Sequence, residues 1–264
     1  LYLSGGRART PGTHFFDGMN VHNPYIRKWN QTYYLYYMGT TFGGPIPGPG
    51  DEVDSSRFTE VWNRKRIGLA TAPSVFGPWT RCDEPLISPR DCSTGLHCND
   101  QSCRRDPARR HDLHALQIAF LRRRSVKIGV AKAPRPDGPF ERILDDPIFN
   151  FEDPNIHLED PYLWYEDGKF RLLIKDDFKN GGPGISGIWG AGLYAESADC
   201  IHWEFAENPV VYSRHVTWSD GRQTDQANCE RPYFLLDENN HPTHLFLATG
   251  EGPAPYQFPE PGTW

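Results

Sequence analysis

In the stretch EDPYLWYEDGKFRLLI, residues 159–174, a charged pair and a proline precede two apolar runs separated by a polar turn. The first run is Tyr162-Leu163-Trp164 and the second is Phe170 to Ile174, with a turn at Glu166 to Lys169. Aromatic and aliphatic runs on either side of an Asp-Gly turn are typical of a β-hairpin. We therefore expect two antiparallel strands here.

The same pattern occurs at two other places in the chain. His22-Asn23-Pro24-Tyr25-Ile26 precedes a polar turn and the strand Tyr33 to Tyr37. Glu230-Arg231-Pro232-Tyr233-Phe234-Leu235 precedes a turn and the strand Thr243 to Leu247. Each copy has two polar residues, a proline, an aromatic residue and a hairpin in the same order, which indicates an internal repeat.

A second unit alternates with these hairpins and consists of a strand, a turn and a short strand. Its copies begin at Arg66, Lys127 and Gly192, and two of them contain a Gly-Pro turn followed by an aromatic residue. Together the two units give four strands about every 60–75 residues, which is the size of a β-propeller blade. The alternative is a β-sandwich in which the similarity of the segments is coincidental.

The composition also favours many short strands joined by turns. The 264 residues include 25 Gly and 24 Pro, and 13% of the residues are aromatic. So many helix-breaking residues leave little room for the long helices of a bundle or of a doubly wound sheet. We therefore expect an all-β chain in which glycine and proline mark the turns and aromatic residues mark the strands.

Charge and apolar patterning argue against two classes of partner. The net charge of −6 argues against a nucleic-acid surface that extends over the chain, and no run of 18 apolar residues predicts a membrane span. We expect neither nucleic acid nor a membrane as a partner. The chain begins with Leu1, so the lack of a signal sequence leaves the compartment open. The spacing of the six cysteines indicates neither a zinc site nor a disulfide framework.

Residues 98–124 interrupt the repeat. They contain seven Arg, three Asp and one aromatic residue, so they carry +4 and the rest of the chain carries −10. A basic nucleic-acid-binding loop is one interpretation of this composition. A propeller repeat is nevertheless due here, between the units that begin at Arg66 and Lys127.

A change of reading frame accounts for this interruption. Codons for Cys98 to Gln117 can be chosen so that the shifted frame reads Ala-Thr-Thr-Asn-Pro-Ala-Val-Val-Thr-Pro-Pro-Asp-Gly-Thr-Thr-Tyr-Met-Leu-Tyr-Lys, which restores the missing hairpin. Our hypothesis is that residues 92–124 are a frameshifted or disordered stretch within one domain of residues 1–264. Resequencing the coding DNA tests this hypothesis, because an authentic reading frame over Cys98 to Gln117 would refute it.

The order of the motifs resembles that of the five-bladed β-propeller glycoside hydrolases, which include arabinanases, β-xylosidases, α-L-arabinofuranosidases and invertases. The most similar pattern is that of family forty-three. The resemblance rests on Phe16 to Pro24, Arg66 to Trp79, Leu158 to Pro161 and Glu230 to Pro232. It implies a five-bladed propeller of which about four blades are present, truncated at both ends. It also implies a carbohydrate substrate and favours a secreted or periplasmic location.

The implied reaction is hydrolysis of a terminal glycosidic bond in a plant or algal polysaccharide or oligosaccharide, by carboxyl groups in the central funnel. Such enzymes pair an acid with a base or nucleophile. Glu159 stands where the family has the acid of its Glu-Gly-Pro motif, although Asp160 replaces the glycine here. Because neighbouring residues on a strand point to opposite faces, we expect one of the two to face the funnel and choose Glu159. Glu230 and Asp17 are the other catalytic candidates, and the family's Asp base lies either at Asp17 or in the absent blade.

Five further residues are expected to bind the sugar: His22, Asn23, Asp160, Lys175 and Arg231. His22 takes the place of Glu159 in its own repeat, and the Arg231 guanidinium suits a bidentate contact with a hydroxyl or carboxylate. For each of these residues a structural role, such as closing a turn or pairing with a neighbouring blade, is the alternative. Trp29, Trp62, Trp79, Trp164 and Trp203 are candidate sugar-stacking residues, with core packing favoured for Trp79 and Trp203.

Other functions remain open at this point. A non-catalytic glycan-binding propeller predicts binding without turnover, and a propeller that binds proteins predicts no carboxyl groups in the funnel. A glycoside phosphorylase or transferase needs a basic phosphate pocket, for which Arg231 is the one indication in the sequence. We predict no cofactor and no metal-ligand set, although the resemblance leaves room for a structural calcium ion in the funnel.

Overall fold

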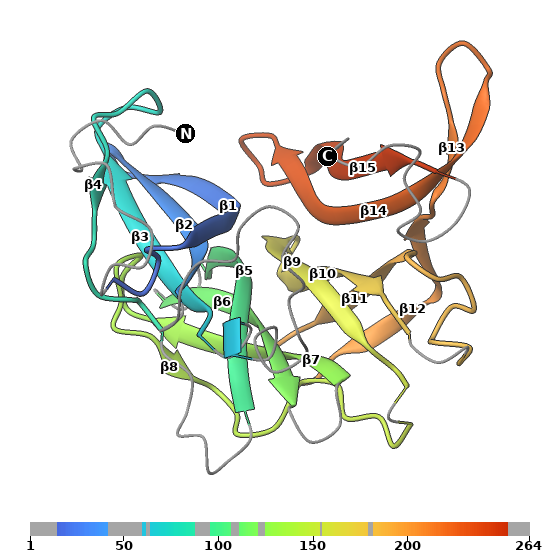
Figure 1. The fold of residues 1–264 in the computed structure, drawn as a ribbon, viewed down its shortest axis with the longest axis horizontal. Coiled ribbons are helices and arrows are strands. Elements are labelled where there is room, and N and C mark those ends of the chain that lie inside the picture. Colours follow the sequence, from blue (N-terminus) through green and yellow to red (C-terminus); the bar gives the residue numbers. More distant parts are fainter. Residues whose placement is uncertain are drawn as a thin grey trace. The chain divides into compact units, whose positions relative to one another are not determined.

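The structure is a computed structural model that describes residues 15–41, 60–61, 64–87, 96–106, 111–120, 125–153, 155–178 and 182–252. For residues 96–106, 111–120 and 125 it describes the backbone alone. The described residues form fifteen strands in four antiparallel sheets (Figure 1). No helix in this part of the chain has the length and apolar character needed to cross a membrane.

Three of the sheets have four strands each, in the order in which the strands follow along the chain. The first sheet contains β1 (Asn20–Trp29), β2 (Thr32–Thr40), β3 (Arg66–Ala72) and β4 (Thr80–Arg81). The second contains β5 (Leu96–Asp106), β6 (His111–Phe120), β7 (Ser125–Ala133) and β8 (Glu141–Arg142). The third contains β9 (Leu158–Glu166), β10 (Lys169–Asp176), β11 (Gly192–Ser197) and β12 (Glu204–Tyr212). The last sheet has three strands, β13 (His215–Thr217), β14 (Gln223–Leu236) and β15 (Pro242–Glu251).

These sheets confirm the all-β fold class and the two repeating units predicted from the sequence. Each hairpin that follows a proline forms the first two strands of a blade-like sheet or, for β14 and β15, the last two of the three-stranded one. The units that begin near Arg66, Lys127 and Gly192 supply the third and fourth strands. The expected number of five blades stays a prediction.

The chain divides into two compact units, which we describe separately. The first unit comprises residues 1–122 and 131–142, and the second comprises residues 123–130 and 143–264. In the first unit, Trp79 is buried with Leu35, Ala70 and Ala72, as expected of a core residue. In the second unit, fully buried aliphatic side chains on β9, β10 and β11 form the centre of the third sheet: Leu158, Leu163, Leu172, Leu173, Ile174 and Leu193.

A β-bulge recurs at the polar pair of every copy of the hairpin motif. Two residues of the first strand oppose one residue of the second between His22 and Tyr25, between Glu159 and Tyr162, and between Glu230 and Tyr233. The residue before each proline has a positive φ: 52° at Asn23, 54° at Asp160 and 53° at Arg231. Bulges re-aim side chains and often lie beside functional sites. The repeat therefore encodes a specific distortion as well as a strand.

The hairpin formed by β5 and β6 has its extra residue at the corresponding place, between Asp100 and Ser102. In the shifted reading frame, the Asn-Pro of the motif falls on residues 101–102. The backbone of this stretch thus follows the repeat, while the reading frame of residues 92–124 stays a prediction. Cys92 and Arg124, the ends of that stretch, lie outside the described residues, as do Leu1 to Thr13 and Trp264.

Candidate active site

Three strands of the second unit bring a cluster of ionisable side chains together. His157 precedes β9, Glu159 lies at the start of β9, Lys175 lies near the end of β10, and Glu230 lies in the middle of β14. Asp177 follows β10, and its backbone N–H donates to the His157 carbonyl at 2.8 Å. In the β9–β10 ladder Glu159 is the partner of Lys175, directly beside the bulge. We call these five residues the Lys175 cluster.

The Lys175 ammonium is the centre of the cluster. Its side chain is fully buried, and Nζ donates to Glu230 Oε1 at 2.9 Å. The same Nζ lies 3.8 Å from Glu159 Oε2 and 3.7 Å from Asp177 Oδ1. Burial on its own would lower the pKa of Lys175, but the carboxylates of Glu159, Asp177, Asp160 and Glu230 outweigh it and hold this pKa well above the usual value. The surroundings of Lys175 therefore favour its protonated form.

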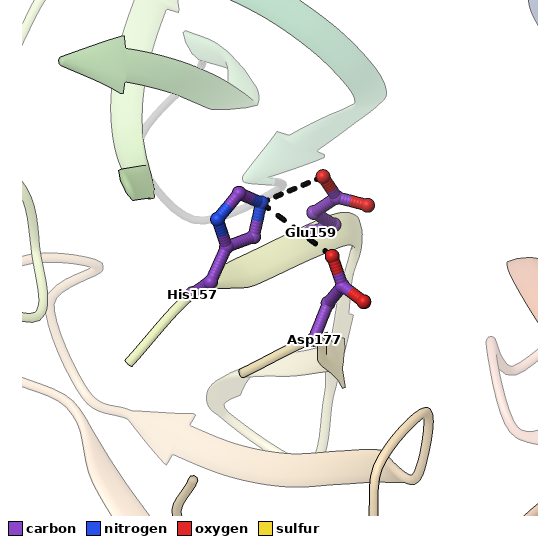
Figure 2. A group of neighbouring side chains, drawn as sticks. All are labelled: His157, Glu159 and Asp177. Carbon is purple, nitrogen blue, oxygen red and sulfur yellow. Dashed lines mark hydrogen bonds and ion pairs between the residues drawn. The ribbon is translucent and has the colours of Figure 1, made fainter. Parts of the chain in front are cut away.

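His157 connects two of the carboxylates. Figure 2 shows its ring nitrogen Nε2 facing both, at 2.7 Å from Glu159 Oε1 and 3.7 Å from Asp177 Oδ2. The other ring nitrogen, Nδ1, accepts the backbone N–H of Val126 at 3.3 Å. An imidazole that accepts at Nδ1 carries its proton on Nε2, so the geometry assigns His157 as the donor to Glu159.

Glu230 binds a cation through each of its carboxylate oxygens. Oε1 accepts from Lys175, and Oε2 accepts from Arg231 Nη1 at 3.0 Å. The Glu230 side chain is buried, whereas that of Arg231 is 45% exposed. Hydrogen bonds from two cations stabilise the charged form of a carboxyl group. The surroundings of Glu230 thus favour its ionised state.

Asp160 links two neighbouring bulges. Its Oδ2 accepts the backbone N–H of Arg231 at 3.0 Å, so the bulge of β9 holds the bulge of β14. Burial raises the pKa of Asp160 to about 6, against the lowering effect of Lys175. Glu159 Oε2 lies 3.8 Å from Lys175 Nζ, and the Asp160 carboxylate also raises the pKa of Lys175, so both members of the pair contribute to the electrostatics of the cluster.

The predicted residues of the first unit occupy different surroundings. The Asp17 carboxylate is buried, and its Oδ2 accepts from Tyr37 Oη at 2.8 Å and from Arg81 Nη1 at 3.0 Å. Burial and the adjacent Asp17 charge raise the pKa of Tyr37 above its usual value. His22 and Asn23 are half-buried at the bulge of β1. The structure brings Glu159, Asp160, Lys175, Glu230 and Arg231 together in the second unit, and Asp17, His22 and Asn23 lie in the first unit.

Sequence reasoning missed His157, Asp177 and Trp189. The Trp189 ring centroid lies 5.1 Å from Lys175 Nζ and 5.5 Å from the Arg214 guanidinium carbon. Asp176 holds the preceding loop, because its Oδ2 accepts the backbone N–H groups of Ile185 and Ser186. Among the tryptophans proposed as sugar-stacking residues, Trp79 and Trp164 are buried and Trp62 lies outside the described residues. A glycine-rich loop after a functional strand is the signal that could have pointed to Trp189.

The donor set does not fit a calcium ion. Donor atoms of His157, Glu159 and Asp177 lie within 4.8 Å of one another, which is close enough for a shared cation. Calcium prefers about six to eight oxygen ligands, however, and one of these three donors is an imidazole nitrogen. The Lys175 ammonium also lies within 3.8 Å of both carboxylates and would repel a second cation. The carboxylates are thus already neutralised in part by a protein group.

Comparison with known proteins gives structural matches and no sequence matches. No protein-family model matches the chain, and no curated protein matches it. Zg3597, a family 117 glycoside hydrolase of the marine bacterium Zobellia galactanivorans, is similar with a TM-score of 0.52 and 19% identity over 78% of this chain. An endo-arabinase from Bacteroides thetaiotaomicron is similar with a TM-score of 0.52 and 14% identity, covering 93% of this chain and 80% of its own. The Bombyx mori GH32 β-fructofuranosidase is similar with a TM-score of 0.54 and 13% identity, covering 88% of this chain and 46% of its own.

These three structures are propeller-type glycoside hydrolases, so the chain has the β-propeller fold found in such enzymes. This confirms the resemblance inferred from the order of the motifs. The chain spans 50% of the Zg3597 chain and 46% of the fructofuranosidase chain. At such low identity the likeness establishes the fold, and the reaction has to be argued from the site.

Proposed function

We propose that the chain is part of a glycoside hydrolase that cleaves a terminal glycosidic bond in a plant or algal polysaccharide or oligosaccharide. The Lys175 cluster is its acid/base site, with Glu159 as the proton donor to the leaving-group oxygen. Glu230 stays ionised and stabilises the positive charge that develops on the sugar ring.

One observation supports this proposal most strongly: two glutamates at equivalent positions of the repeat have different electrostatic surroundings. Glu230 receives hydrogen bonds from Lys175 and Arg231. Glu159 receives a hydrogen bond from the His157 imidazole, and its other oxygen lies 3.8 Å from Lys175 Nζ. Glu159 has a neutral donor and a more distant ammonium, so its charged form is stabilised less than that of Glu230, and such a difference between two carboxyl groups is typical of acid/base pairs.

The experiment is a hydrolysis assay of the purified chain on a panel of plant and algal oligosaccharides and aryl glycosides. We expect release of sugar by the wild-type chain and a loss of about 10²–10⁴-fold in kcat/KM for Glu159→Gln, the range typical of a general acid. Glu196→Gln is the matched control, because Glu196 is a half-exposed glutamate on β11 that pairs with Lys169.

The same assay separates the proposed function from its main rival. If the wild-type chain binds an oligosaccharide without cleaving it, the glycan-binding interpretation replaces the hydrolase. If Glu159→Gln cleaves as well as Glu196→Gln, Glu159 is not the acid. Product release that depends on added inorganic phosphate would identify a phosphorylase.

A further inference from the structure

We propose that Lys175 is the positioning residue of this site: its buried ammonium fixes Glu230 as a carboxylate and orients Glu159 beside it. The sequence suggested that Lys175 binds substrate, but its side chain is fully buried and ends among protein groups. The proposal rests on the proposed function, because it explains how the two glutamates acquire different roles.

The position of Lys175 follows from the bulge of β9. Two residues of β9, Asp160 and Pro161, oppose one residue of β10, and Glu159 on the far side of the bulge is paired with Lys175. A lysine at this point of β10 reaches across to β14, where Nζ meets Glu230 Oε1 at 2.9 Å. One ammonium therefore joins the motif of one sheet to the same motif of the next.

Groups from every neighbouring element surround the ammonium. Glu159 of β9, Glu230 of β14 and Asp177 after β10 lie within 3.8 Å of it. Asp160 of β9, Cys229 of β14 and Tyr212 of β12 interact with it electrostatically. The Trp189 ring lies 5.1 Å away, at cation–π distance. Of the cations in this region, Lys175 is the fully buried one, while the Arg231 side chain is 45% exposed. Removal of the ammonium would leave the four carboxyl groups without their central counter-charge.

The test compares Lys175→Met with Lys169→Met. Lys169 lies on the same strand and pairs with a glutamate, but its side chain is 49% exposed, so it is a matched control. We expect the acidic limb of the kcat/KM profile to move up by about one pH unit or more in Lys175→Met. That limb reports a group that must be ionised, here Glu230, and loss of the neighbouring ammonium disfavours its ionised form. Lys169→Met should have the profile of the wild-type chain.

A double variant keeps the test decisive if Lys175→Met does not fold. Lys175→Met with Glu230→Gln removes one cation and one anion together, so we expect it to recover folding that either single change loses. It should nevertheless remain without hydrolytic activity, because the Glu230 charge is gone. Unfolding in urea measures how much stability the double variant recovers. The hydrolysis assay, on the substrate that the wild-type chain cleaves, measures its activity.

Three results would overturn the proposal. The first is a folded Lys175→Met variant with the pH profile of the wild-type chain. The second is a double variant that is no more stable than the less stable single variant. The third is a double variant with wild-type activity, which would show that the pair is merely structural. If the wild-type chain hydrolyses no glycoside, or if Glu159→Gln stays active, the proposed function itself fails, while the urea measurements still report the ionic coupling.

Discussion

The two ends of β10 carry the same chemical pair in opposite surroundings. At the hairpin end, Lys169 pairs with Glu196 of β11, and the two side chains are 49% and 36% exposed. At the other end, six residues along, Lys175 pairs with Glu230 of β14, and the side chains are 0% and 8% exposed. The pairing chemistry is the same, so the difference between the two ends is one of burial and of the additional groups present.

This difference shows which end of β10 carries an ion pair that is energetically unfavourable to bury. An exposed ion pair contributes about 0–1 kcal/mol, since water and salt screen it. A buried ammonium must be balanced by partners, and Lys175 has four carboxyl groups around it. The bulge that assembles these groups recurs at the start of the other hairpins. A costly arrangement on a repeated distortion is typical of a functional site.

The largest expected effect is that of Lys175→Met on stability. Removing one partner of a buried ion pair costs about 3–5 kcal/mol, because the remaining charges are left buried without a partner. Urea unfolding at pH 7 measures this loss. A change below about 1 kcal/mol would mean that the buried end of β10 behaves like the exposed one.

Asp160→Asn tests how burial acts on an acid of the same site. The pKa of Asp160 is raised to about 6 from 3.8, so its contribution to stability is fully present below about pH 4 and is lost as the pH rises through 6. We expect the wild-type chain to gain up to about 3 kcal/mol over Asp160→Asn as the pH falls from 7 to 4. Urea unfolding of both proteins across this range measures the difference. A difference in the free energy of unfolding that does not change with pH would contradict the raised pKa assigned to the buried Asp160.

Tyr37→Phe extends the comparison to the buried pair of the first unit. The Tyr37 hydroxyl donates to Asp17 Oδ2, which also accepts from Arg81. Loss of a hydrogen bond to a charged group costs about 1.5–3 kcal/mol, so we expect a loss in that range. Thermal or urea unfolding checks it. No measurable change would show that Arg81 alone holds Asp17.

The smallest effect is expected at the exposed end of β10. Lys169→Met should change the free energy of unfolding by less than about 1 kcal/mol, and salt should reduce the effect further. Unfolding in low and high salt gives the comparison. A loss as large as that of Lys175→Met would remove the distinction between the two ends.

The repeated motif made much of the fold predictable. Proline and aromatic residues at fixed offsets located the hairpins, and β2, β10 and β15 begin within one residue of the predicted places, whereas β14 begins at Gln223, before the predicted Glu230. The recurrence of the Glu-x-Pro pattern also selected Glu159 and Glu230 together, because equivalent positions of a repeat occupy equivalent places in neighbouring sheets. Periodicity in the sequence is sufficient for these inferences.

The internal arrangement of the site was less predictable, for physical reasons. Strict alternation assumes a regular strand, but a bulge with a positive φ at Asp160 interrupts β9 between Glu159 and Tyr162. Lys175 looked like a substrate ligand because its burial by β14 depends on contacts more than 50 residues away in the chain. His157 and Asp177 lie just outside the strands, where no repeat identifies them.

The most direct test of the account is the dependence of Glu159→Gln on the leaving group. A general acid matters most when the departing oxygen is a poor leaving group, and little when it departs as a stable phenolate. For the glycosyl group that the chain cleaves, we predict that kcat/KM falls about 10²–10⁴-fold when the leaving group is another sugar, which departs through its hydroxyl oxygen. The fall should be much smaller when the leaving group is dinitrophenolate. Equal losses on both substrates would contradict the assignment of Glu159 as the acid.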